Sequence, residues 1–326
     1  MIESTPRIAS TAEVVEELRR RTSFVMVSHV KPDGDTLGAG LALGLALKQL
    51  GKRVAYFQQD DVPRNLRFLP DADLVSRELP ADLPADTLYV FCDMSDSKRA
   101  GELLPPVARE NVLDIDHHLG NALFGKLNFV LEQECSTGSV VMHLLRALGV
   151  TIDARIATCI LATVMTDTGG FMHSNTTPEA LDLSAELMRF GADKEEITEE
   201  IFLRRRVAAT KLLGRVIDAM RFAHDGRYSF SHVDDAMLAQ TGADGEDTED
   251  IVNTLLGQDG VDVAALFKAI DGEIRVSLRS SGRINVQAAA QRLGGGGHFR
   301  ASGLTYHGSL QEAFAGVEAA LVAEGL

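Results

Sequence analysis

Aspartate and histidine gather at four separate places in the first half of the chain. They stand in the segments SHVKPDGD, LYVFCD, VLDIDHH and VMTDTGG, and they are His29, Asp33, Asp35, Asp93, Asp116, His117, His118 and Asp167. Each group lies next to a run of apolar residues. A mixture of carboxylate and imidazole ligands without thiolates suits hard-to-borderline divalent ions, and Mn²⁺ above all. The pattern therefore predicts a metal centre, for which we expect Mn²⁺, with Mg²⁺ and Co²⁺ as alternatives.

Six of these groups match two metal ions. Four carboxylates and two imidazoles provide ligands for two sites, and the four negative charges balance the charge of two divalent ions. Two ions about 3.5–4 Å apart can share a hydroxide and clamp a phosphate for in-line displacement. We therefore expect metal-assisted phosphoester hydrolysis, in which a bridging hydroxide attacks phosphorus.

A second candidate site lies near the end of the chain, in the run GGGGHFRASG. Four consecutive glycines allow several backbone N–H groups to converge on an anion, because no Cβ blocks the approach. Of the seven basic residues from position 225 onward, five lie within 275–300. This clustering predicts a phosphate-binding patch. Its candidate residues are Arg279, Gly295, Gly296, Gly297, His298, Arg300 and Ser302.

Alternating strands and helices must position the first group of residues. Short apolar runs typical of strands occur at 24–27, 53–57, 88–93 and 112–116. Helical patterns occur at 36–50, 139–148 and 154–166. This alternation indicates an α/β fold with a doubly wound parallel sheet, which binds ligands at the carboxyl ends of its strands. The sequence thus predicts that the aspartates and histidines meet at one edge of the sheet.

The rest of the chain changes character. A length of 326 residues fits two domains. Residues 1–190 form the expected parallel-sheet domain, and the charged helical pattern at 191–224 is expected to be a connector. Residues 225–326 are strand-rich, with Asp271-Gly272 as a two-residue hairpin turn, and predict a smaller α/β domain with a mixed or antiparallel sheet.

The composition excludes several classes of protein. The net charge of −15 argues against holding long duplex DNA, which needs a basic face. Three cysteines rule out a disulfide framework and a four-cysteine zinc site. No apolar run approaches the ~18–20 residues that cross a bilayer, and the first residues lack the pattern of a secretory signal. We therefore expect a cytoplasmic protein with no membrane partner.

In these motifs the chain resembles the DHH phosphoesterase superfamily, in the branch with a DHH-associated C-terminal domain. The resemblance runs from SHVKPDGDTLGA through DMSD, DHH and TDTGGF to VSLRS and GGGGHFRASG. It is strongest to the bifunctional oligoribonucleases, or nano-RNases, that also dephosphorylate 3′-phosphoadenosine 5′-phosphate (pAp). It implies that residues 1–190 are the catalytic DHH domain and that residues 225–326 bind substrate.

The resemblance also implies a role for each candidate residue. One ion would be held by His29, Asp33 and Asp93. The other would be held by Asp35, Asp93, His117 and Asp167, with Asp93 bridging the two. Asp116 would orient an imidazole, and His118 would contact the scissile phosphate. Arg279 and the GGGGH run with His298 would hold the distal phosphate or nucleotide end.

The implied activity is hydrolysis of short nucleotides. Its substrates would be short single-stranded RNA or DNA oligonucleotides (nanoRNA) and linear dinucleotides such as pGpG and pApA, cleaved to mononucleotides, and pAp, converted to AMP. Two alternatives stay open: a cyclic-dinucleotide phosphodiesterase acting on c-di-AMP, and a non-catalytic nucleotide-binding protein of the same fold. The sequence leaves open the preferred substrate, the direction of digestion, the preference for RNA or DNA, and whether the protein is a homodimer.

Overall fold

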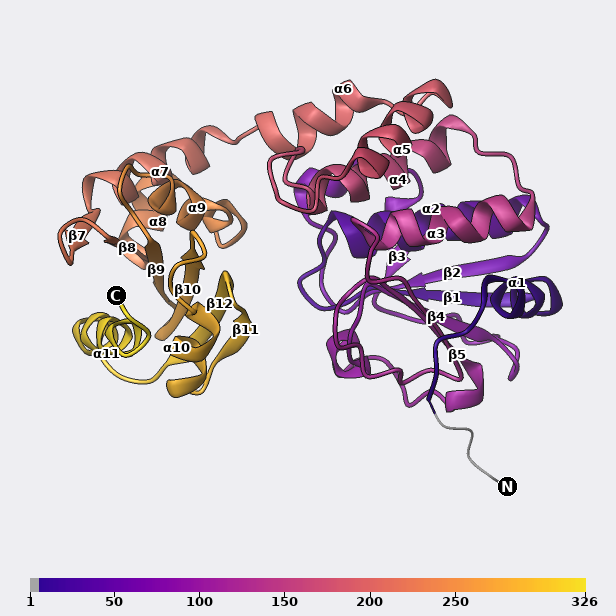
Figure 1. The fold of residues 1–326 in the computed structure, drawn as a ribbon, viewed down its shortest axis with the longest axis horizontal. Coiled ribbons are helices and arrows are strands. Elements are labelled where there is room, and N and C mark those ends of the chain that lie inside the picture. Colours follow the sequence, from indigo (N-terminus) through magenta and orange to yellow (C-terminus); the bar gives the residue numbers. More distant parts are fainter. Residues whose placement is uncertain (1–5) are drawn as a thin grey trace. The chain divides into compact units, whose positions relative to one another are not determined.

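The computed structural model describes residues 6–326, which divide into two compact units (Figure 1). Along the chain, the boundary between the units lies between Arg204 and Arg205. This boundary falls inside the stretch 191–224 that was expected to be a connector. Ile197 belongs to the core of the first unit, whereas α7 (Val207–Asp218) belongs to a core of the second. The stretch is therefore divided between the two units.

The first unit is built on a six-stranded parallel sheet. Its strands are β1 (Ser23–Val27), β2 (Arg53–Phe57), β3 (Val75–Ser76), β4 (Leu88–Cys92), β5 (Val112–Asp116) and β6 (Leu127–Val130). The strand order is β3-β2-β1-β4-β5-β6, and every neighbouring pair is parallel. The order reverses between β1 and β4, and such a switch point is where open parallel sheets bind ligands. The predicted parallel sheet is confirmed.

The two faces of this sheet are covered differently. One face packs against α-helices (Figure 1), namely α1 (Thr11–Arg20), α2 (Gly34–Gln49), α3 (Thr137–Leu148) and α4 (Ala154–Asp167). The other face is covered by irregular chain that contributes Leu83, Leu104 and Val107. Prolines at 80, 84, 105 and 106 explain why this chain forms no α-helix. The unit also contains α5 (Pro178–Arg189), α6 (Lys194–Ile197) and the π-helical turn η5 (Thr198–Leu203).

Glycines allow α2 to lie directly against α4. A Cβ at Gly34 would lie 2.4 Å from Cγ2 of Thr166, and a Cβ at Gly38 would lie 2.5 Å from Cγ2 of Thr163. Larger residues at these two positions would push the helices apart. Because α2 begins beside Asp33 and α4 ends at Asp167, this close packing brings their carboxylates to the same edge of the sheet.

The second unit contains a mixed sheet, as predicted. Its strands are β7 (Arg221–Ala223), β8 (Tyr228–Asp234), β9 (Val263–Ile270), β10 (Glu273–Ser280), β11 (Gly296–His298) and β12 (Ala301–Tyr306). The order is β11-β12-β10-β9-β8-β7, in which only the pair β8–β9 is parallel among the described strands. The turn between β9 and β10 is the predicted hairpin, with positive φ angles of 52° at Asp271 and 77° at Gly272.

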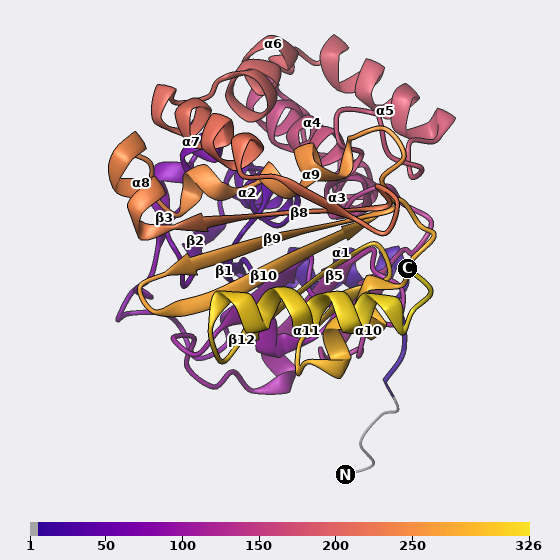
Figure 2. The ribbon, with the colours of Figure 1, turned by 90° about the vertical axis from the view of Figure 1, so that its left-hand side faces the viewer.

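Helices cover both faces of the second sheet. On one face the core includes side chains of α10 (Val286–Arg292) and α11 (Leu310–Val322), and Figure 2 shows α11 lying along the sheet. On the other face the core includes side chains of α7 and α9 (Ile251–Leu256), with α8 (Asp235–Thr241) beside them. Between residues 6 and 326, no helix has both the length and the apolar character needed to cross a membrane.

Candidate metal centre and substrate-binding face

The predicted metal ligands of the first unit come together at the carboxyl edge of its sheet. His29 follows β1, Asp93 follows β4, His117 follows β5, and Asp167 is the last residue of α4. Three groups of side chains each place their ligand atoms within 4.8 Å of one another. These groups are His29, Asp33 and Asp93; Asp35, His117 and Asp167; and Asp93, His117 and His118. The edge of the sheet therefore presents adjoining clusters that could hold metal ions.

Asp93 lies where the clusters join. Its Oδ2 is 3.4 Å from Nε2 of His29, and its Oδ1 is 3.7 Å from Nε2 of His117. The Thr137 hydroxyl donates a hydrogen bond of 3.0 Å to the same Oδ1. Asp93 has a φ of +65°, a left-handed conformation that turns the chain sharply at the end of β4. One carboxylate thus faces both sides of the centre, which is the geometry of a bridging ligand.

The two histidines turn the same ring nitrogen toward the carboxylates. Nδ1 of His29 lies 2.9 Å from the Val30 carbonyl oxygen, and Nδ1 of His117 lies 3.1 Å from the Glu134 carbonyl oxygen. Because a carbonyl only accepts, each Nδ1 carries the proton and donates it. Nε2 of His29 is buried and has no hydrogen-bond partner. This arrangement is how proteins fix the tautomer of a metal-binding imidazole, so these residues fit a metal ion.

The pKa values show that the cluster lacks positive charge. Burial, followed by the charges of Asp93 and Asp167, raises the pKa of Asp35 well above its usual range. Burial also raises the pKa of Asp167 to about 6. Burial alone would lower the pKa of His29, but Asp33 and Asp93 outweigh it and raise that pKa to about 9. Protons bound to these groups offset the negative charge of the carboxylates. Divalent cations bound at the same place would offset that charge instead.

Backbone groups that sequence analysis missed hold two of the carboxylates. At the start of α3, the N–H groups of Thr137 and Gly138 donate to the two oxygens of Asp35 at 2.7 and 3.0 Å. A Cβ at Gly138 would lie 1.9 Å from Oγ1 of Thr163, so this close approach requires glycine. Asp33 caps α2 by accepting from the N–H groups of Asp35 and Thr36. The sequence predicted a helix at 139–148, and its local signal for the start of α3 is the run CSTGS.

His118 is held differently from the other two histidines. Its Nδ1 lies 2.8 Å from Oδ1 of Asp116, and the other oxygen of Asp116 accepts 2.7 Å from Nδ2 of Asn121. The hydrogen bond to Asp116 raises the pKa of His118. The side chain of His118 is 25% exposed. His118 is therefore suited to contact a substrate.

In the second unit, strand register aligns two of the predicted substrate-binding residues. Arg279 of β10 is opposite Ala301 of β12, which is opposite His298 of β11. Directly opposite residues project from the same face of a sheet. The neighbouring row consists of Ser277, Gly303 and Gly296. Arg279 and His298 therefore flank a floor of small residues, on the face turned away from α10 and α11.

The glycine run begins in a turn and continues into the edge strand β11. A Cβ at Gly295 would lie 2.4 Å from the Gly303 carbonyl oxygen, so Gly295 permits close packing on β12. Gly296 and Gly297 pair with β12, and Gly297 has a φ of +136°. Ser302 is buried, and its hydroxyl donates to the His298 carbonyl at 2.8 Å. The structure thus gives Gly295 and Ser302 a role in shaping the hairpin.

Arg300 lies in the turn between β11 and β12. Its residue is exposed, and its guanidinium lies beside Gly282, where a Cβ would come within 2.8 Å of Nη2. Its backbone carbonyl accepts from the Ser280 N–H at 2.9 Å, which ties the turn to the end of β10. Arg300 therefore remains a basic group near Arg279 in the chain fold, but it is outside the row that contains Arg279 and His298.

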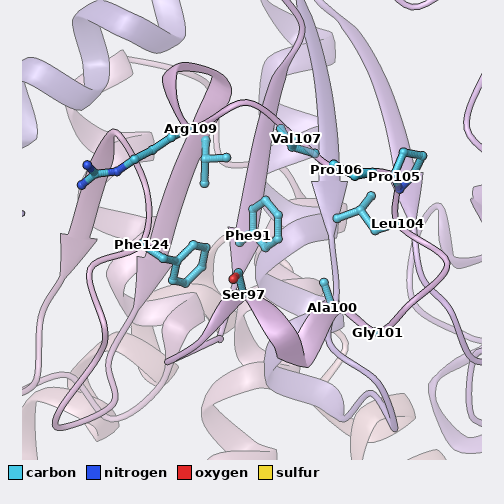
Figure 3. Close-up of a pocket in the computed structure, with 11 residues that line it drawn as sticks. Phe91, Ser97, Ala100, Gly101, Leu104, Pro105, Pro106, Val107, Arg109 and Phe124 are labelled. Atoms are coloured by element: carbon cyan, nitrogen blue, oxygen red, sulfur yellow. The ribbon is translucent and has the colours of Figure 1, made fainter. Parts of the chain in front are cut away.

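A cavity of about 230 Å³ lies in the first unit, on the face of its sheet that irregular chain covers (Figure 3). Phe91, Phe124, Leu104 and two prolines line it, and its only charged lining residue is Arg109. None of the predicted metal ligands lines this cavity. The chemistry-bearing side chains are therefore gathered at the strand ends and not in this apolar hollow.

Comparisons with known proteins agree with this arrangement. The model of the DHH family, N-terminal domain, matches residues 23–164, and that of the DHHA1 domain matches residues 229–323. The bifunctional oligoribonuclease and PAP phosphatase NrnA of Thermus thermophilus is 34% identical over 305 residues, which cover 93% of this chain and 90% of that protein. The cyclic-di-AMP phosphodiesterase GdpP of Geobacillus thermodenitrificans is 28% identical over 307 residues, which cover 87% of this chain but 44% of that protein.

A solved structure shares the fold along nearly the whole chain. The crystal structure of an exopolyphosphatase-related protein from Bacteroides fragilis has a TM-score of 0.87 and 26% sequence identity, and the match covers 98% of both chains. The resemblance seen in the sequence motifs is thus confirmed in both units. This chain belongs to the DHH family, with its DHH domain followed by a DHHA1 domain.

Proposed function

We propose that this protein is a metal-dependent phosphoesterase that cleaves short oligonucleotides and linear dinucleotides to mononucleotides and converts pAp to AMP. The observation that carries the proposal is the position of Asp93, whose two carboxylate oxygens face His29 on one side and His117 on the other. The substrate class is supported by the NrnA relative, which matches 93% of this chain. Nucleotides of this kind occur in the cytoplasm, where the proposal places the protein.

The proposed cofactors are two divalent ions, with Mn²⁺ preferred because carboxylates and imidazoles form the whole donor set. His29, Asp33 and Asp93 would hold one ion. Asp35, Asp93, His117 and Asp167 would hold the other. Such a pair supplies an activated water at neutral pH and stabilises charge on both reacting oxygens of a phosphate. The four carboxylates would match the charge of the two ions.

His118 is proposed to bind the scissile phosphate through Nε2. Asp116 accepts the Nδ1 proton, and Asn121 fixes the second oxygen of Asp116. This chain of hydrogen bonds orients the ring and favours its protonated form, because it raises the pKa of His118. A protonated Nε2 donates a charge-assisted hydrogen bond to a phosphoryl oxygen, which is stronger than a neutral one.

The row of Arg279, Ala301 and His298 is proposed to hold the distal phosphate or nucleotide. Among the described residues no carboxylate forms an ion pair with Arg279, whose Nη1 donates to the Leu278 carbonyl at 3.0 Å. The planar guanidinium fits a phosphate bidentately. Ala301 is the residue between Arg279 and His298, and its small side chain would leave room for a ligand between them. We propose that this face recognises substrate and that the metal centre cleaves it.

A second candidate is cleavage of cyclic dinucleotides. It is favoured by the match of GdpP to 87% of this chain. A cyclic and a linear dinucleotide offer the same phosphodiester to a metal centre, so the two functions differ only in how the rest of the substrate is held.

Turnover measurements separate these functions. The purified protein, loaded with Mn²⁺, is supplied with pAp, pGpG, pApA, c-di-AMP and oligonucleotides of increasing length, and products are separated by chromatography. We expect AMP from pAp, mononucleotides from the linear dinucleotides, and slower cleavage of c-di-AMP. Faster cleavage of c-di-AMP than of pApA would favour the second candidate. Protein that contains two ions, binds these nucleotides and cleaves none of them would be a binding protein, and the proposed function would be wrong.

A further inference from the structure

Arg99 lies beside the metal centre but has no role in the function described so far. It belongs to the 3-10 turn η3 (Ser97–Ala100), six residues after Asp93. Its backbone carbonyl accepts from the Val30 N–H at 2.7 Å, next to His29. Its Nη1 donates to the backbone carbonyl of Asp93 at 3.3 Å. Arg99 thus joins the loops that carry His29 and Asp93, and its guanidinium is fixed where they meet.

The charge of Arg99 has no counterpart in the described part of the chain. No carboxylate lies within ion-pair distance of its guanidinium there, although the side chain is half-buried. Its positive charge acts to lower the pKa of both His29 and His118, so it is close to both rings. The neighbouring Lys98 is exposed. A half-buried, unpaired guanidinium next to a charge-balanced metal centre is a site for an anion.

The guanidinium of Arg99 also has donors left for a substrate. One N–H of the guanidinium is used by the Asp93 carbonyl, and the remaining donors can bind the oxygens of a phosphate.

We propose that Arg99 is a further catalytic residue, whose guanidinium binds a non-bridging oxygen of the phosphoryl group under attack. The inference rests on the proposed phosphoesterase function. In phosphoryl transfer, charge is spread over the equatorial oxygens of the transition state, and a positioned arginine stabilises it there. Arg99 would supply this contact from the DHH domain itself, on the side of the centre where His29 and His118 lie. His118 would bind the phosphate from a second direction.

The alternative is that Arg99 only tethers the Asp93 carbonyl. Two substitutions separate the roles. Arg99→Gln removes the charge and keeps an N–H donor, whereas Arg99→Lys keeps the charge and loses the planar pair of donors. Lys98→Gln is the matched control, because it removes the same charge from the same turn at an exposed position. A tether would make both Arg99 variants lose bound metal or thermal stability together.

The test uses the full-length protein loaded with Mn²⁺ and the small diester bis-p-nitrophenyl phosphate. Removing one preorganised donor to a developing oxyanion lowers kcat by about 10²–10³-fold. We expect Arg99→Gln to lower kcat/KM by about a hundredfold, mainly through kcat, and Arg99→Lys to lower it by about tenfold. Lys98→Gln should remain within about twofold of the wild type. All three variants should retain two ions per chain and the Tm of the wild type.

Binding of inorganic phosphate, measured by calorimetry, gives a readout that does not depend on turnover. We expect Arg99→Gln to weaken this binding at least tenfold and Lys98→Gln to leave it unchanged. If the wild type cleaves no phosphoester, the proposed function fails, and phosphate binding still decides the role of Arg99. If Arg99→Gln loses its metal ions, Arg99→Lys decides. A metal-loaded Arg99 variant that matches the control in rate and in phosphate binding would overturn the inference.

Discussion

Asp114 carries a carboxyl group in the middle of β5 that the folded protein holds without a partner. The residue is fully buried, and neither of its carboxyl oxygens has a hydrogen-bond partner. Burial, followed by the charge of Asp116, raises the pKa of Asp114 from 3.8 to about 8. The folded protein therefore keeps a proton on Asp114 over a pH range in which the unfolded chain releases it.

The sign and size of the effect follow from this difference. Above pH 3.8 only the unfolded chain is ionised at this position, so Asp114 lowers the free energy of unfolding progressively until the pH reaches about 8. One pKa unit corresponds to about 1.4 kcal/mol, which gives a cost of about 4 kcal/mol at pH 7 and about 2 kcal/mol at pH 5. The variant Asp114→Asn cannot ionise. Relative to wild type, its free energy of unfolding should rise by about 2–3 kcal/mol from pH 5 to pH 7.

Urea unfolding at pH 5, 6 and 7 measures this difference for the transition that includes the first unit. The protein is kept free of metal by a chelator, because metal affinity itself depends on pH. Asp182→Asn, an exposed substitution in α5, serves as the control and should change stability by no more than about 0.5 kcal/mol at any pH. If the curves of wild type and Asp114→Asn stay parallel from pH 5 to pH 7, Asp114 is ionised in the folded protein and the reasoning is refuted.

Three further predictions concern the metal centre and the substrate-binding face. Protein stripped of metal should lose phosphodiesterase activity and regain it with Mn²⁺; full turnover without metal, verified by elemental analysis, would contradict the mechanism. Asp93→Asn should reduce the metal content below two ions per chain and lower kcat at least about a hundredfold, because electrostatic stabilisation at both sites is lost. Two bound ions and a normal rate would exclude a bridging role for Asp93. Arg279→Ala should lower kcat/KM for pAp and dinucleotides about ten- to a hundredfold, because that is the contribution of one charge-assisted hydrogen bond to binding. Its metal content and its hydrolysis of bis-p-nitrophenyl phosphate should change little. Equal losses on both kinds of substrate would place Arg279 in the chemistry itself.

The position of the candidate metal centre could be predicted from the sequence, because the topology of a parallel sheet determines where its strands end. In a parallel sheet all strands end at one edge, so an aspartate or histidine after each apolar run must lie near the others. Helix caps are likewise formed by residues close in sequence: Ser10 and Ser309 form capping boxes, and Asp153 caps α4. These signals depend only on neighbouring residues. The strands β3 and β6, of two and four residues, are too short to give such a signal.

The groups that hold the ligands could not be predicted, because they come from distant parts of the chain. Thr137 and Gly138 donate to Asp35 across more than 100 residues. The residues next to Asp35 in the sequence do not predict this contact. The residues next to Gly138 do not predict that Gly138 packs on Thr163. Arg99 is similar, since its position follows from the hydrogen bond between its carbonyl and Val30. Spacing identifies residue types that can bind metal, whereas tertiary packing decides which groups orient them.

The glycine run shows how the same residues can suit two structures. Glycine removes the Cβ that would block an anion, and it also removes the Cβ that would block a neighbouring strand. Gly295 lies so close to the Gly303 carbonyl that a Cβ would not fit, so here the missing Cβ allows close packing on β12. The register between β11 and β12 then places His298 opposite Ala301, and so in line with Arg279. In the proposed substrate site, the glycines at 296 and 303 form the open floor beside these two side chains, so substitution of either by a bulky residue should weaken nucleotide binding without touching the metal centre.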